Sequence, residues 1–118
     1  MTVGDSSLSV SFHGVRGSTA CHDPHTHRYG GNTSCVSVKT ADDATIIFDL
    51  GTGLRYLKAT HNQTDPEPFV GSCLLTHLHW DHIQGLPFFK SLLCEETVLD
   101  IYAPKQQDGR SLREIFLK

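Results

Sequence analysis

The chain has 118 residues, an apolar content of 38% and a formal net charge of −3, values that fit one globular domain or part of one. It lacks an apolar run of about eighteen residues, so we expect no membrane span. The first residues lack the positive segment and apolar core of a signal peptide, so we expect a cytoplasmic protein. No basic run occurs, and we do not expect nucleic acid as a partner.

Alternating and β-rich stretches predict strands, and turn residues separate them. The ranges expected as strands are 8–12, 35–38, 45–48, 71–75 and 97–102. A polar loop over 19–29 carries His22, His25 and His27, and we interpret it as a solvated loop whose histidines could also lend ligands to a metal.

Helical segments are expected between the later strands. They are a short helix after the Gly51-Thr52-Gly53 turn, a helix over 83–90 interrupted near Pro87, and a helix over 112–117 with Ser111 as its N-cap. Strands with flanking helices predict an α/β layered architecture. The four cysteines are widely spaced and have no C-x-x-C pair, so we expect free thiols, with Cys35 and Cys73 in the core.

Three histidines and one aspartate lie within six positions directly after the strand expected over 71–75. His77 and His79 alternate onto the same side of an extended segment, so both rings could reach one ion. Asp81 and His82 follow on a turn and could face a second ion. Imidazole and carboxylate ligands suit zinc, manganese or iron(II), and two ions about 3.5–4 Å apart can activate a shared water.

A plainer interpretation exists for part of this string. Asp81 stands three residues before Gln84, which is the spacing of a capping box, so its carboxylate could cap a helix. Capping and ligation are compatible because a carboxylate has two oxygens. The density of ligand types nevertheless favours a two-metal hydrolytic site.

Four motifs in chain order resemble the metallo-β-lactamase fold superfamily, and within it a phosphodiesterase-like subgroup. They are GVRGS at 14–18, RYGGNTSC at 28–35, DLGTGLR at 49–55 and THLHWDHIQGLPFF at 76–89. The resemblance implies that residues 1–118 form a single partial domain, the N-terminal half of an αββα sandwich. It implies a mixed β-sheet with flanking helices and the metal site at one edge.

The same resemblance implies roles for particular side chains. His77 and His79 would bind one metal, Asp81 and His82 the second, and Asp49 would support the site from the end of its strand. Asp49 could instead cap the turn that follows it.

Three further residues lie on turns that the superfamily fold would place near the site. They are His13, Arg16 and Asn32. Substrate contact and a structural role in the turn are both open for each.

The activity implied is metal-dependent hydrolysis of a small-molecule or nucleotide phosphodiester, with Asp81 ligating and orienting a metal-held hydroxide. Zinc is the preferred metal, up to two ions, with manganese or iron as alternatives. Members of the superfamily carry further ligands in a second half that cannot be assigned here, so we expect an incomplete site. The alternative is a truncated half-domain without catalytic activity that folds by self-association. Half a sandwich leaves an apolar sheet face open, which predicts a homodimer.

Overall fold

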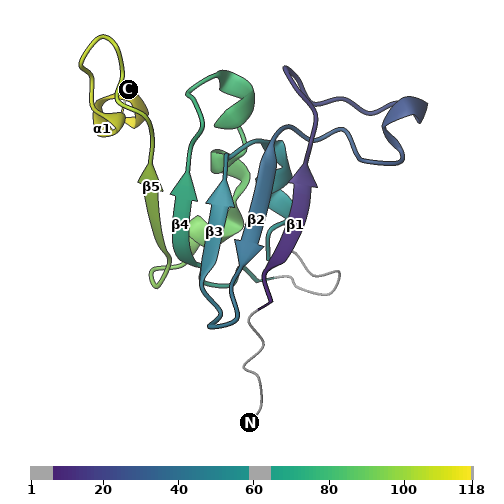
Figure 1. Ribbon diagram of the computed structural model, residues 1–118, viewed down its shortest axis with the longest axis horizontal. Helices are drawn as coiled ribbons and strands as arrows, with labels where there is room; N and C mark the ends of the chain where they lie inside the picture. The colour runs from purple at the N-terminus through teal and green to yellow at the C-terminus, as the bar shows by residue number, and fades with distance from the viewer. Residues whose placement is uncertain (1–6, 59–64, 118) are drawn as a thin grey trace.

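The computed structural model describes residues 7–58 and 65–117. Over these ranges five strands form one sheet in the order β1-β2-β3-β4-β5 (Figure 1). The strands are β1 (Ser9–Gly14), β2 (Cys35–Lys39), β3 (Thr45–Phe48), β4 (Val70–Leu74) and β5 (Val98–Tyr102). The remaining elements are the 3-10 turns η1 (Pro24–Thr26), η2 (Thr52–Tyr56), η3 (Trp80–His82), η4 (Leu86–Phe88) and η5 (Lys90–Leu93), and the helix α1 (Leu112–Phe116).

The sheet is mixed. β2 is antiparallel to β1 and β3, whereas β4 is parallel to both β3 and β5. The carboxyl ends of β1, β3, β4 and β5 therefore meet at one edge of the sheet, where their arrowheads lie in Figure 1. Ligand sites of open α/β sheets lie beyond such an edge. The predicted α/β class, a mixed sheet with flanking helices, is confirmed.

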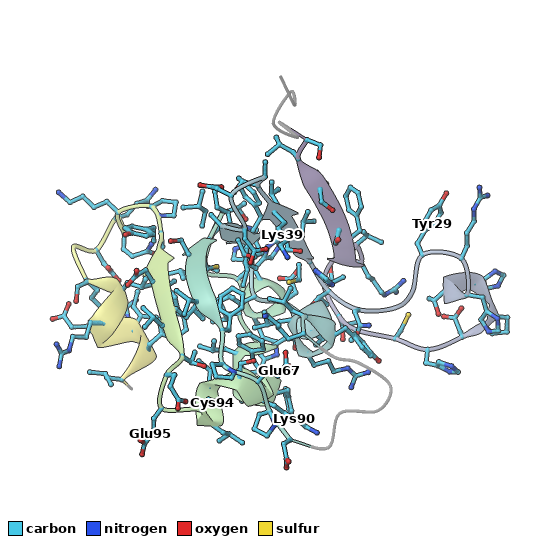
Figure 2. The ribbon with its side chains drawn as sticks, turned by 90° about the horizontal axis from the view of Figure 1, so that it is seen from below. Tyr29, Lys39, Glu67, Lys90, Cys94 and Glu95 are labelled. Atoms are coloured by element: carbon cyan, nitrogen blue, oxygen red, sulfur yellow. The ribbon has the colours of Figure 1, made fainter. Side chains whose placement is uncertain are left out.

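One face of the sheet carries the core. Ile47 and Cys73 are fully buried on neighbouring strands, and Phe69 and Phe89 pack edge to face against each other with ring centroids 5.5 Å apart. Figure 2 shows Lys90 and Cys94 on the side of the sheet that carries the 3-10 turns. The core thus lies between the sheet and these turns.

The other face is exposed within the described part of the chain. A row of cross-strand neighbours runs over all five strands on this face: Phe12, Val36, Phe48, Leu74 and Tyr102. Phe12 is 71% exposed and Tyr102 59%. None of the helices in residues 7–58 and 65–117 is long and apolar enough to cross a membrane.

The expected helix over 83–90 is wrong, because the chain there forms only the short 3-10 turn η4 and the first residue of η5. Pro87 has no N–H to continue an α-helix and disfavours helical backbone in the residue before it. The Gly85 N–H donates to the Leu50 carbonyl, 2.8 Å away, and so joins a neighbouring loop instead of a helix. The helix behind Ser111 is confirmed, with a capping box between Ser111 and Glu114.

Candidate metal centre

The four predicted ligands lie where the chain leaves β4 at the carboxyl edge of the sheet. η3 turns the chain so that the ring of His82 comes back over His77, with ring centroids 3.9 Å apart. The centroids of His77 and His79 are 4.4 Å apart. The three imidazoles are thus gathered on one side of the turn, and Asp81 lies within the same turn.

Asp49 supports this cluster from the end of β3. Its side chain is 5% exposed, and the carboxylate accepts the backbone N–H of Thr76 at 2.8 Å and lies 2.9 Å from His82 Nδ1. Its φ of +63° is a left-handed conformation that aspartate tolerates better than most residues. The bonds of the Asp49 carboxylate go to Thr76 and His82, whereas the Gly51 N–H donates to the Ser34 carbonyl.

Asp81 lies on the other side of His82. One carboxylate oxygen accepts the Ser18 N–H at 3.0 Å and lies 3.4 Å from His82 Nε2. The N-cap of η3 is His79, so Asp81 does not cap this turn. Desolvation works against ionisation of Asp81, but the Ser18 N–H and the charge of His82 outweigh it and lower the pKa of the carboxyl. Asp81 is therefore an anion at neutral pH.

These donors fit a divalent cation. To bind a metal, His82 must be the neutral imidazole: Nδ1 would then donate to Asp49, and the Nε2 lone pair would face a cation held between it and Asp81. A tetrahedral zinc ion with bonds of about 2.0–2.2 Å holds neighbouring donors about 3.4 Å apart, close to the His82–Asp81 separation. Within residues 7–58 and 65–117, however, no three or more histidine, cysteine, aspartate or glutamate side chains are placed so that together they could hold one metal ion.

The side chains of the other three predicted residues, His13, Arg16 and Asn32, make their hydrogen bonds outside this cluster. His13 Nε2 lies 2.8 Å from Ser37 Oγ within the sheet, and burial lowers the pKa of the His13 imidazole. Arg16 Nε donates to the Thr19 carbonyl, 2.8 Å away, and so folds onto its own turn. Asn32 Oδ1 accepts from Thr52 Oγ1 at 3.1 Å and lines a pocket.

Two residues of the cluster were not anticipated from the sequence. Thr76 Oγ1 lies within hydrogen-bonding distance of both Asp49 oxygens and of His77 Nδ1, at 2.9 Å from the latter. In the sequence, only its position directly before His77 could have indicated that Thr76 belongs to the cluster. Ser18 reaches Asp81 from 63 positions away. It closes the GVRGS motif at 14–18, but that motif does not indicate which residue Ser18 contacts.

The chain is similar to bacterial proteins named Ribonuclease Z. It is 37% identical over 82 residues to that of Streptococcus suis (strain 98HAH33) and 36% identical over 83 residues to that of Streptococcus pneumoniae (strain CGSP14). These matches cover 62% and 63% of this chain but only 25% and 26% of the relatives, so the chain spans about a quarter of their length. No family model and no solved structure matches. The similarity supports the resemblance to the metallo-β-lactamase fold superfamily.

Proposed function

We propose that this chain is a single partial domain of a divalent-metal-dependent hydrolase that cleaves phosphodiesters. The observation that carries the proposal is His82, held at Nδ1 by Asp49 and facing Asp81 with Nε2, inside a cluster with His77 and His79. The partial similarity to Ribonuclease Z supports the same class of reaction.

His77, His79, Asp81 and His82 would hold the metal, with zinc preferred and manganese or iron as alternatives. When bound, the metal would lower the pKa of a water and offset charge on the phosphate. Asp49 fixes the orientation of His82 and, through Thr76, the start of the ligand string. The Asp81 carboxylate, held by the Ser18 N–H, would accept a hydrogen bond from the attacking water and direct it toward phosphorus.

The substrate class is a phosphodiester, in a small molecule, a nucleotide or RNA. The lack of a basic run argues against binding of nucleic acid through many phosphates at once. The name of the relatives points to RNA, which a site contacting only one or two phosphates would still accommodate.

The test combines metal content with turnover. The chain would be loaded with zinc or manganese and dialysed, and its metal measured per chain alongside hydrolysis of bis(p-nitrophenyl) phosphate. We expect bound metal and turnover, and we expect His79→Ala to lower both, turnover by at least about a hundredfold, because a ligand is lost. His25→Ala is the matched control, since His25 is an exposed histidine on η1 and should leave both values unchanged. If the native chain retained no metal after dialysis and showed no turnover, the alternative of a half-domain without catalytic activity would be favoured instead.

A further inference from the structure

The loop between β1 and β2 carries three histidines, His22, His25 and His27, around the turn η1. All three are exposed, and none belongs to the histidine cluster at the carboxyl edge of the sheet. Imidazole is a ligand of zinc, copper and nickel ions, and short histidine-rich tracts are typical of metal-binding segments. Two of these histidines are arranged so that they can share an ion.

Hydrogen bonds of the backbone close this loop at its base and cap it at its tip. The Cys21 N–H donates to the Gly31 carbonyl at 3.0 Å, which joins the two sides of the loop. At the tip, the Asp23 carboxylate accepts the His25 N–H at 2.7 Å and caps η1. The backbone that carries the histidines is therefore held in one turn before any ion binds.

The turn brings the rings of His22 and His27 together, although they are five positions apart. Their centroids lie 6.3 Å from each other, and their planes are inclined by 40°. A ligating imidazole nitrogen lies about 2.0–2.1 Å from its metal, so the centroids of two ligating rings are about 5–6 Å apart, according to the angle at the ion. Both side chains are exposed and can rotate by the small amount that remains.

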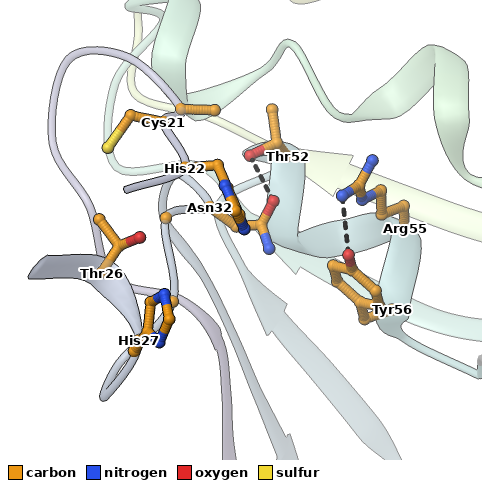
Figure 3. Close-up of a pocket in the computed structure, with 11 residues that line it drawn as sticks. Cys21, His22, Thr26, His27, Asn32, Thr52, Arg55 and Tyr56 are labelled. Atoms are coloured by element: carbon orange, nitrogen blue, oxygen red, sulfur yellow. Dashed lines mark hydrogen bonds between the residues drawn. The ribbon is translucent and has the colours of Figure 1, made fainter. Parts of the chain in front are cut away.

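Both rings line an open pocket of about 680 Å³ between the loop and the turn η2 (Figure 3). Cys21 lines the same pocket and adds a thiol to the ligand types around it, whereas His25 does not line it. On the η2 side, the Arg55 guanidinium donates to the Tyr56 hydroxyl at 2.7 Å, so its charge is directed onto its own turn. The pocket thus gives an ion and its water ligands room beside the two imidazoles.

We propose that His22 and His27 form a metal site of their own, which binds one divalent zinc, copper or nickel ion between the two imidazoles. Because the described part of the chain places no third ligand side chain around the same point, water completes the coordination of the ion. The bound ion joins the two sides of η1 and holds the loop along one wall of the pocket. This site is separate from His77, His79 and His82 and does not require the proposed hydrolysis.

The loop site can be tested with nickel(II), which is paramagnetic with nitrogen and water ligands and broadens nearby NMR signals. The full chain would be stripped of metal with EDTA, dialysed and titrated with nickel(II). We expect the imidazole signals of His22 and His27 to broaden together, and the amide signals of Thr26 and Gly30 to report the affinity of the loop. His22→Ala and His27→Ala should each weaken that affinity at least about tenfold, because one of two protein ligands is lost.

His25→Ala is the matched control, since it removes an exposed histidine of the same loop that does not line the pocket. It should leave the affinity of the loop for nickel(II) unchanged. Equal weakening by all three alanine variants, or a titration that leaves the signals of His22 and His27 sharp, overturns the proposal. His79→Ala should lose turnover of bis(p-nitrophenyl) phosphate but keep nickel binding in the loop, so the proposed function and the loop site fail or hold separately.

Discussion

Asp49 shows how one residue joins the core to the site. Its backbone ends β3 in a left-handed conformation, and its buried carboxylate orients both Thr76 and His82. The sequence marked Asp49 as a strand-end carboxylate, but its partners lie 27 and 33 positions away. A buried carboxylate is stable only with such donors, so the site and the local fold depend on the same hydrogen bonds.

The buried thiols of Cys35 and Cys73 give a test at the level of single residues. Burial, followed by the negative charge of Asp49, raises the pKa of both Cys35 and Cys73 from 9.0 to about 12. We expect a thiol reagent such as Ellman's reagent to label the partly exposed Cys21 and Cys94 first, and the buried pair only as the chain unfolds. A Cys21→Ser/Cys94→Ser double variant should lose the fast phase. Equal rates for all four thiols would contradict this arrangement.

The raised pKa of the Cys35 and Cys73 thiols also affects the stability of the fold. The unfolded chain releases these protons as pH rises through 9.0, whereas the folded chain holds them until about 12. Ionisation therefore favours the unfolded state, and the free energy of unfolding should fall as pH rises from 9.0 toward 12, as urea denaturation at a series of pH values would measure.

At the level of elements, the strands were predictable to within one or two residues, because β-branched and alternating patterns report which side of a strand is buried. The ligand string was predictable as residue types at a strand end. The turn that carries Asp81 and His82 was also expected, but the turns η4 and η5 were not, because hydrogen bonds to a distant loop help to decide the path of the chain there, as Gly85 and Leu50 show. The periodicity of the sequence does not indicate such a distant partner.

A substitution at Gly85 tests this packing. A Cβ there would lie 1.9 Å from the Gly51 carbonyl oxygen and 2.9 Å from that of Leu50, so backbone must move. We expect Gly85→Ala to lower the free energy of unfolding by about 1–3 kcal/mol, measured by urea denaturation, because overpacking displaces the loop that holds Asp49. Gly17→Ala is the control, since a Cβ at Gly17 meets no atom within 4 Å. Equal stability of the two variants would refute the close approach.

For the whole molecule, the main feature is a sheet covered on one face. The exposed face carries Phe12, Phe48 and Tyr102 in one cross-strand row, with further apolar side chains such as Val70 and Val98 beside it. Contiguous apolar surface of this kind favours association, because packing sheet on sheet removes it from water. The homodimer inferred from the sequence stays a prediction, and this face is where we expect its interface.

The predicted dimer interface can be tested by placing a charged side chain on the exposed face of the sheet. Phe12 is 71% exposed on the open face, and Leu93 is 80% exposed on η5, behind the sheet. We expect size-exclusion chromatography with light scattering at low micromolar concentration to give twice the 13.1 kDa of one chain. Phe12→Lys should shift the mass toward one chain, because a lysine cannot enter a dry sheet-to-sheet contact without losing hydration. Leu93→Lys adds the same charge elsewhere and should leave the mass unchanged. A native chain that elutes as a stable monomer, or equal effects of the two substitutions, would exclude pairing through this face.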